Sequence, residues 1–563
     1  MRKTIILPIS VRIFCPGDPR RDLKRRETGF HVTLRQDAGV GDQPDFARIG
    51  CSSQESRPCS GHFFSNFFED RMMRSNLNPA VYKRLTSKEL MDVFDRDDEE
   101  SSARLLSSPI TEEQNSNPPW RLSLPHVCVA TICSFLFGYH LAVVNETLES
   151  ISMELGFAGN TLAEGFVVSI CLGGAFVGCS FSGLIADGVG RRRAFQLSAL
   201  PMIFGACLSA STGNLQGMLL GRFFVGIGMG IAPPVASLYV AEVSPPSVRG
   251  TYGSFIQIAT CLGLIAALLV GLPAKDVMGG WRVCFWLSAA PAAMLALCME
   301  FCAESPHWLH KHGRIGEAEA EFERLLGASH VKSAMSELSR SDRGDDADGV
   351  KFSELLYGRH FRVVFIGTTL FALQQLSGIN AVFYFSSVVF KRAGVPSNIA
   401  NICIGFANLI GSIIAMLLMD KLGRKVLLVG SFSGMAATLG LQVFAASSHF
   451  LGSWTLYLSV GGMLLFVFTF ALGAGPVPGL LLPEIFPNKI REKAMAVCMS
   501  VHWVFNFFIG LLFLRMLELI GAKILYTIFA SFCLIATAFV KRNVVETKGR
   551  SLQEIEISLL APE

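Results

Sequence analysis

Twelve long apolar stretches alternate with short polar segments along this chain, and they limit its fold more than any other feature. A helix needs about 20 apolar residues to cross the hydrocarbon core of a bilayer. The stretches cover residues 124–146, 163–186, 193–212, 216–240, 252–272, 281–302, 362–390, 398–420, 424–446, 454–482, 492–516 and 521–541. The sequence therefore predicts an all-α membrane protein with twelve transmembrane helices.

The composition excludes several classes of protein. Of the 563 residues, 51% are hydrophobic and only 17% are charged, which is less charge than soluble domains carry. The net charge of +4 is too small to indicate nucleic-acid binding. The 15 cysteines lie mostly in apolar stretches without disulfide or metal-ligand spacing, so we expect neither metal nor cofactor. The chain has no nucleophile–base constellation and no Gly-Lys dipeptide for a Walker A loop, which argues against an enzyme or an ATP-driven pump.

Basic residues between the stretches predict the orientation in the membrane. The loops at 147–160 and 447–453 contain no Lys or Arg. Basic residues face the other side, at Arg191, Arg192, Arg193, Arg249, the 310–362 loop, Arg424, Lys425, Lys541 and Arg542. Because cytosolic loops carry the excess of Lys and Arg, both termini and the central loop are predicted to be cytosolic.

Three charged motifs occur twice, once in each group of six stretches. The pairs are Asp187-x-x-Gly190-Arg191 with Asp420-x-x-Gly423-Arg424, Glu242 and Arg249 with Glu484 and Arg491, and Glu304-Ser305 with Glu546-Thr547. The last two pairs share one offset of 242 residues. Such a repeat indicates two homologous halves with a binding site between them. The predicted divisions are a tail (1–120), a first six-helix half (121–302), a cytosolic linker loop (303–361), a second half (362–542) and a tail (543–563).

Eight motifs in a fixed order resemble those of one transporter family. They are GLIADGVGRRR, GRFFVGIGMG, YVAEVSPPSVRG, ESPHWL, QQLSGINAVFYFS, MDKLGRK, GPVPGLLLPEIF and ETKGRSLQEIE. Together they resemble the sugar porters of the major facilitator superfamily. Within that family, FGYHLAVVN followed by GPVPGLLLPEIFP is similar to the plant plastidic glucose transporters. The resemblance implies the major facilitator fold and facilitative transport of a hexose, glucose in particular, by alternating access.

The repeated acids and arginines are expected to form a ring of ion pairs at the cytosolic helix ends. Its members are Asp187, Arg191, Glu242, Arg249, Asp420, Arg424, Glu484 and Arg491. Orientation alone would explain the arginines, but acids contribute little to orientation. The resemblance implies that this network latches the two halves together when the cavity faces outward.

Amide side chains in apolar stretches are the candidate sugar ligands, because an amide can both donate to and accept from hydroxyl groups. Gln374, Gln375 and Asn380 flank Ser377-Gly378, where a membrane helix could be broken. The alternative is that these amides only join helices to one another. The resemblance adds Gln257, Asn408, Trp503 and Asn506 as substrate-binding residues. For Trp503, a packing role is an equal alternative.

Two positions depart from the family pattern. Gly479 stands where an aromatic residue usually follows G-P-x-P, and Ala471 stands where many relatives carry a sugar-contacting Glu. The site is therefore expected to be roomier and less acidic, which leaves the identity of the sugar open.

The resemblance also marks His140 and Arg222 as the coupling position. Sugar symporters of the family carry an Asp in the first span that pairs with the arginine, whereas this chain has His140. Burial and the arginine both disfavour the imidazolium, so we expect a neutral histidine. The sequence thus favours a facilitator; a proton-coupled symporter or a non-transporting sugar sensor are the alternatives.

The first 118 residues are polar and are expected to be disordered. Residues 1–40 are rich in Arg but also contain four acids, which dilutes a transit-peptide signature. Met72 or Met73 could be the first residue of a shorter protein. The chloroplast envelope membrane is therefore expected from the resemblance, with a Golgi or other endomembrane as the alternative. We expect a monomer whose partners are a small sugar and the lipid bilayer.

Overall fold

A computed structural model describes residues 118–342, 358, 360–392, 394, 397–447, 454–487, 490–548, 550 and 554. The predicted disordered tail therefore lies almost wholly outside the described residues. Within the described part, twelve helices are long and apolar enough to cross a membrane, which confirms the predicted fold class. The predicted lengths were too short in places: the first helix continues to Glu154, eight residues beyond the predicted end.

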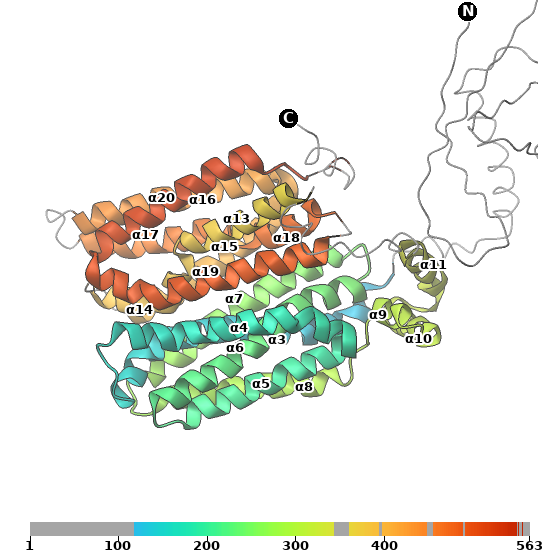
Figure 1. The fold of residues 1–563 in the computed structure, drawn as a ribbon, viewed down its shortest axis with the longest axis horizontal. Coiled ribbons are helices and arrows are strands. Elements are labelled where there is room, and N and C mark those ends of the chain that lie inside the picture. Colours follow the sequence, from blue (N-terminus) through green and yellow to red (C-terminus); the bar gives the residue numbers. More distant parts are fainter. Residues whose placement is uncertain are drawn as a thin grey trace, which may run out of the picture. The chain divides into compact units, whose positions relative to one another are not determined.

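The first six long helices pack together as one group (Figure 1). They are α3 (Trp120–Glu154), α4 (Thr161–Val189), α5 (Arg191–Ser211), α6 (Leu215–Val243), α7 (Arg249–Ala274) and α8 (Gly280–Met299). Small residues allow their backbones to approach closely, as is common in membrane helix pairs. A Cβ at Gly138 of α3 would lie 1.9 Å from the Thr260 carbonyl oxygen of α7, so no larger residue fits there without separating the helices.

The linker contains short helices rather than only a loop. They are α9 (Pro306–Lys311), α10 (Ile315–Leu326), the 3₁₀ turn η2 (Ala328–His330) and α11 (Val331–Asp342). In α10 the apolar residues Ala318, Phe322 and Leu325 recur at helical spacing and are buried, while the charged residues between them are largely exposed. An amphipathic pattern of this kind stabilises a short helix by tertiary packing. The predicted linker thus contains helices within its described residues 303–342.

The second group of helices follows the linker (Figure 1). Its members are α13 (Phe361–Leu376), α14 (Ile379–Arg392), α15 (Ser397–Leu422), α16 (Arg424–Ser447), α17 (Trp454–Ala471), α18 (Pro476–Ile485), α19 (Arg491–Leu519) and α20 (Gly521–Asn543). Contacts between the two groups join α4 to α19, α7 to α15 and α3 to α14. At the α4–α19 crossing, a Cβ at Gly165 would lie 2.3 Å from the Leu511 carbonyl oxygen.

Two spans of the second half are broken by glycine-containing turns. The seventh span is interrupted at Ser377-Gly378, as the sequence predicted, and the tenth at residues 472–475. Gly378 has φ = +83°, a conformation that other residues rarely adopt. A Cβ there would also lie 2.5 Å from the ring of Phe529, so the break depends on this glycine.

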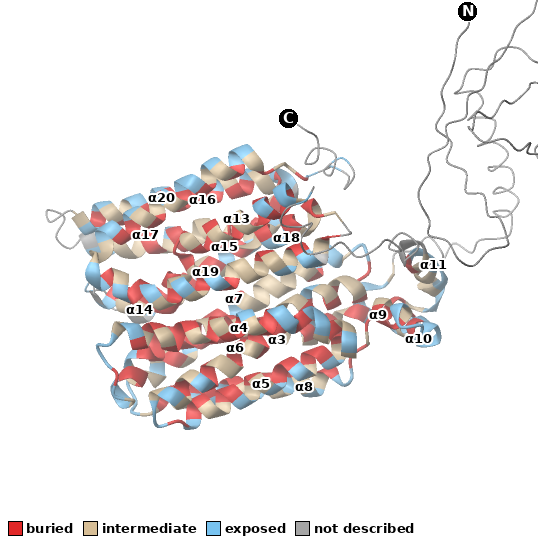
Figure 2. Cartoon of the chain, in the orientation of Figure 1, coloured by how far each residue is buried: buried red, intermediate tan, exposed pale blue. Residues whose placement is uncertain are grey.

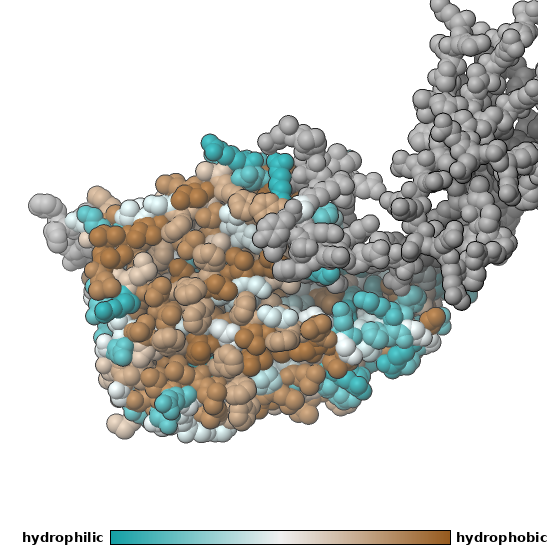
Figure 3. Space-filling model, viewed as in Figure 1, coloured by the Kyte–Doolittle hydropathy of each residue, from teal (hydrophilic) through white to brown (hydrophobic). Residues whose placement is uncertain are grey.

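The surface of the helix bundle is apolar where lipid would contact it. Figure 2 shows exposed and partly exposed positions along the outer faces of the long helices, and Figure 3 shows these faces to be largely hydrophobic. Leu184, Phe204 and Leu417 are examples, with more than half of each side chain exposed. Hydrophilic residues gather instead over the linker helices (Figure 3).

Candidate functional site

Four polar side chains form one network around the break in the seventh span. Gln375 Nε2 donates to Gln374 Oε1 at 3.3 Å and to His502 Nδ1 of α19 at 2.9 Å. Asn380 Nδ2, beyond the break, donates back to Gln375 Oε1. Gln374 and Gln375 are buried, whereas Asn380 and His502 are partly exposed.

The same network connects the two broken spans. Gln374 Nε2 donates to the carbonyl oxygen of Ala474 at 2.6 Å and lies 3.5 Å from that of Gly475. These carbonyls belong to the turn between α17 and α18, and Ala474 lies four residues before Pro478, which has no N–H to donate to it. Gln374 therefore fixes the position of one helix break against the other.

A second group lies further along α14 and α19. The Tyr384 hydroxyl donates to Asn506 Oδ1 at 3.0 Å, and both residues are buried. The ring of Trp503 is 2% exposed, lies 5.1 Å from that of His502 and meets Phe137 of the first half edge-on at 6.0 Å. Trp503 thus links the polar network to the first half.

The candidate residues Gln257 and Asn408 meet at a cysteine. Asn408 Nδ2 of α15 donates to Cys261 Sγ of α7 at 3.4 Å, and Gln257 Nε2 donates to the same sulfur at 3.8 Å. The seven predicted sugar ligands thus fall into three groups, each held by a residue that the sequence did not single out: His502, Tyr384 and Cys261. One signal was available for His502, since it lies four residues before Asn506 and so shares its helix face.

The two departures from the family pattern differ in their surroundings. Gly479 is exposed, and a Cβ there would meet nothing within 4 Å. Ala471 is buried, and its Cβ would lie 2.6 Å from one added at Gly411. There is therefore room for a larger side chain at Gly479, whereas Gly411 has no room for one beside Ala471. No group of three or more His, Cys, Asp or Glu side chains among the described residues could hold a metal ion.

At the coupling position, Arg222 contacts the backbone of His140 rather than its ring. The guanidinium donates twice to the His140 carbonyl oxygen at 3.3 Å and to the Val167 carbonyl oxygen at 3.3 Å. Arg222 is 2% exposed and His140 is fully buried, and neither ring nitrogen of His140 has a partner within the described part of the chain. The arginine therefore obtains its acceptors from backbone carbonyls.

The charged ring of the first half is centred on Arg191. Its guanidinium pairs with Glu242 at 2.9 Å and with Asp187 at 3.1 Å, and the side chains of Arg191 and Glu242 are at most 10% exposed. Arg249 is exposed and takes part in no ion pair that the described residues form. Within the described residues, Glu242 thus pairs with Arg191, another member of the predicted ring.

In the second half, Arg424 pairs with Glu484 at 3.0 Å, and the Thr547 hydroxyl donates to the same carboxylate at 2.6 Å. Among the described residues, Arg491 donates to the Phe486 carbonyl oxygen at 3.4 Å and forms no ion pair. The side chain of Asp420 lies outside the described residues. These pairs join residues of one half, so a latch between the halves stays a prediction.

Glu304 and Glu546 explain the third repeated motif, because each caps the start of a helix. Glu304 accepts from the backbone N–H groups of Arg191 at 2.9 Å and Arg192 at 3.2 Å, at the start of α5. Glu546 accepts from those of Arg424 at 2.9 Å and Lys425 at 3.0 Å, at the start of α16. Helix N-termini favour such carboxylates.

The glycine of the repeated Asp-x-x-Gly-Arg motif makes room for these caps. A Cβ at Gly190 or Gly423 would lie 2.5 or 2.6 Å from the capping carboxylate, and both glycines have φ near +90°. Burial raises the pKa of Glu546, but hydrogen bonds from four backbone N–H groups outweigh it and bring the pKa below its usual range. For Glu304, burial dominates and raises the pKa.

We expect Glu546→Ala to lower the free energy of unfolding by about 1–2 kcal/mol, as loss of a helix cap does. Because the folded state lowers the pKa of Glu546, this stabilisation is present at neutral pH and is lost as the pH falls below about 4. Thermal unfolding of purified protein in detergent measures the effect. The control is Glu319→Ala, which removes an exposed acid from α10. Equal melting temperatures for the two variants at neutral pH would contradict the capping role.

Polar contacts join the two halves at the end of the bundle away from the linker. Asn145 Nδ2 of α3 donates to Ser386 Oγ of α14 at 2.7 Å, and its Oδ1 accepts from the Ser387 N–H at 3.0 Å. Asn401 Nδ2 of α15 donates to Glu146 Oε1 of α3 at 2.5 Å. All of these side chains except Ser387 are at most 5% exposed.

A further pair of contacts reinforces this closure. Thr161 at the start of α4 donates to Glu518 Oε2 near the end of α19 at 2.9 Å, and Lys391 of α14 pairs with Glu149 of α3. The halves are thus held together at this end, whereas the ion pairs at the linker end stay within each half. We interpret the conformation as inward-facing.

Comparisons with known proteins agree with this geometry. Residues 126–559 match the family described as Sugar (and other) transporter. The chain is 67% identical over 481 residues to "Probable plastidic glucose transporter 3" of Arabidopsis thaliana. The matched residues cover 85% of this chain and 96% of that relative. It is 44% identical to "Plastidic glucose transporter 4" of the same organism, over 77% of this chain and 80% of the relative.

A solved structure supports the fold. The inward open conformation of the xylose transporter XylE from E. coli matches with a TM-score of 0.66 and 28% sequence identity, over 77% of this chain and 99% of that one. The resemblance to sugar porters that the eight motifs indicated is confirmed. The chain belongs to the sugar transporter family and has the fold of the major facilitator superfamily.

Proposed function

We propose that this protein carries hexose, with glucose as the main substrate, across the plastid envelope by facilitated diffusion with alternating access. The relatives named above support glucose and the plastid, because two thirds of the residues are identical to one of them over nearly its whole length. The observation that carries the proposal for the site is the network of Gln374, Gln375, Asn380 and His502 at the break of the seventh span.

The network suits a sugar for physical reasons. Each amide offers two donors and an acceptor, and a hexose hydroxyl can serve as either partner. Asn380 and His502 are partly exposed, which would allow them to contact a ligand. Trp503 supplies an apolar ring beside them for the C–H face of a sugar.

Uptake of labelled sugars into proteoliposomes tests the function. We expect glucose to equilibrate across the membrane with saturable kinetics, and unlabelled glucose to compete for uptake. Other hexoses and pentoses, tested as competitors, would define the specificity that the open space at Gly479 leaves undecided. Protein that binds glucose but does not move it would indicate a sensor instead. A fluorescent fusion of the full chain in plant cells would test the plastid location.

We predict that Arg424→Ala, or reversal of the charge at Glu484, shifts the resting population further toward the inward-facing state. In an outward-facing state the cytosolic helix ends of the two halves approach, and the charged ring could then bridge them. A pair can bias two states only by the difference in its stability between them. Labelling of single cysteines in the cavity from each side measures the ratio. The control is Arg314→Ala, which breaks the exposed pair with Glu317 in the linker. If the charged-ring variants label as the wild type does, the latch is wrong.

A further inference from the structure

Two proposed sugar ligands from opposite halves meet at a single sulfur atom. Cys261 of α7 is fully buried, and its sulfur accepts from Asn408 Nδ2 of α15 at 3.4 Å and from Gln257 Nε2 at 3.8 Å. Ser412 Oγ, one turn after Asn408, lies 3.6 Å from the same sulfur. Because α7 belongs to the first half and α15 to the second, Cys261 is a polar contact between the halves.

Asn408 has an unused acceptor next to this sulfur. The residue is 6% exposed, and its Oδ1 has no hydrogen-bond partner within the described part of the chain. Buried amide oxygens are rarely left without a donor. With Nδ2 held by the sulfur, Oδ1 on the same amide is left to accept from a ligand, and a sugar hydroxyl is a suitable donor.

We propose that Cys261 is a positioning residue of the sugar site, which holds Asn408 in the orientation that leaves its Oδ1 to accept one sugar hydroxyl. The inference rests on the proposed function of this site. A thiol fits the role because sulfur is a weak acceptor. It satisfies the amide donors when no sugar is bound, yet gives them up readily when a hydroxyl replaces it or when the halves separate.

Three variants test the proposal in proteoliposomes. Cys261→Ala removes the acceptor, and we expect the KM for glucose to rise about threefold to tenfold while the maximal rate per folded protein stays within about twofold. Cys261→Ser supplies an oxygen in nearly the same place, so we expect it to restore the KM to within about twofold of the wild type. The control is Cys284→Ala, because Cys284 is equally buried but its sulfur, within the described part of the chain, donates to the backbone carbonyls of Val270 and Gly280 and to no side chain.

Deoxyglucoses separate positioning from a general packing defect. If Asn408 Oδ1 accepts one hydroxyl, the analogue that lacks this hydroxyl should bind wild type and Cys261→Ala equally, whereas every other analogue should lose affinity in the variant. In an Asn408→Ala background, Cys261→Ala should then change the KM little. An equal loss for all analogues, or an unchanged KM in Cys261→Ala, would overturn the proposal.

Failure of the proposed function would look different, since the wild type itself would then not transport glucose. If Cys261→Ala does not fold, Cys261→Ser still tests the positioning role of Cys261. It must keep the deoxyglucose profile of the wild type, and a change in that profile would count against a positioning role.

Discussion

Replacing Gln375 or Asn380 by alanine is expected to raise the KM for hexose about tenfold to hundredfold, while the protein still inserts and folds. Gln375 is the centre of the network at the helix break, since it contacts Gln374, Asn380 and His502. Loss of one buried partner of a polar ligand costs about 1–3 kcal/mol, and each 1.4 kcal/mol is tenfold in affinity. Initial rates of glucose uptake over a range of concentrations measure the change.

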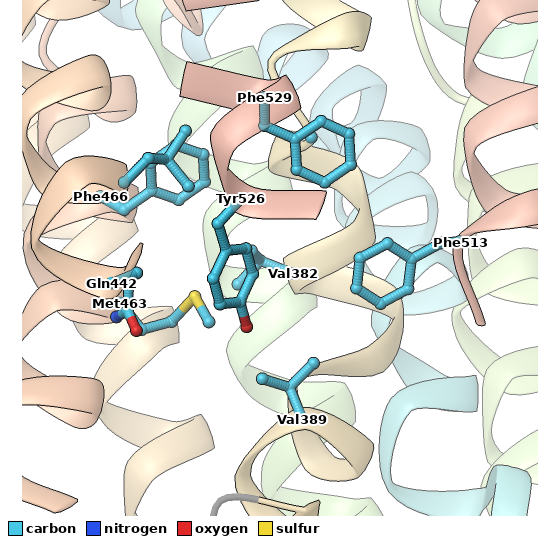
Figure 4. Close-up of a pocket in the computed structure, with 10 residues that line it drawn as sticks. Val382, Val389, Gln442, Met463, Phe466, Phe513, Tyr526 and Phe529 are labelled. Atoms are coloured by element: carbon cyan, nitrogen blue, oxygen red, sulfur yellow. The ribbon is translucent and has the colours of Figure 1, made fainter. Parts of the chain in front are cut away.

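A matched control for this experiment is Gln442→Ala in α16. Gln442 is also a buried membrane glutamine, 2% exposed, and its Nε2 donates to the Ser459 carbonyl oxygen at 2.6 Å. It lines a small pocket of mostly apolar residues with Met463, Tyr526 and Phe529 (Figure 4). If buried glutamines only join helices, Gln375→Ala and Gln442→Ala should reduce the amount of folded protein similarly and leave the KM unchanged. That result would refute the sugar site at Gln375.

The sequence predicted the spans and the break in the seventh one because both depend on local chemistry. An apolar stretch of about 20 residues has few alternatives to a membrane helix, and Gly378 after Ser377 marks a break because glycine tolerates φ = +83°. The helices of the linker were missed because they are short and amphipathic, and their stability comes from packing of residues such as Phe322.

The pairing of charged residues was less predictable. The sequence placed Glu242 in one ring with four arginines without assigning its partner, and in the structure Arg191 from another helix reaches it. Spacing along one chain describes only neighbours within a helix, whereas partners across helices depend on how the helices cross. For the same reason the capping role of Glu304 and Glu546 was not deduced: the motifs repeat visibly in the sequence, but the helix starts that they cap lie more than 100 residues away.

The contacts that close the far end were also beyond the sequence. Nothing in the sequence around Asn145 indicates that it bonds to Ser386, 241 residues later. Glu146 lies at the end of the first predicted span, and its partner Asn401 comes from a span of the other half. Such contacts depend on which conformation the halves adopt, and one sequence encodes more than one.

The second large effect concerns energetics: we expect the wild type to equilibrate glucose without accumulating it, even across a pH gradient. Concentrative transport needs a group whose protonation differs between the outward-facing and inward-facing states. Arg222 has no carboxylate beside it in the structure as described; its donors go to the carbonyl oxygens of His140 and Val167. Since backbone carbonyls do not titrate, a proton gradient has nothing to act on at this position.

Proteoliposomes with a pH step of about two units measure this directly. Such a step stores about 2.7 kcal/mol per proton, enough for roughly hundredfold accumulation if one proton moved with each sugar. We expect the internal glucose concentration to reach the external one and to stay there, with or without an uncoupler. Accumulation that collapses on addition of an uncoupler would show that the protein is a proton-coupled symporter.

In that case Glu146→Gln would help to locate the proton carrier, because Glu146 is a buried carboxylate of the first span. If accumulation survived in that variant, His140 or Glu164 would be the next candidate, and if it disappeared, coupling would reside at the closed end where Glu146 meets Asn401.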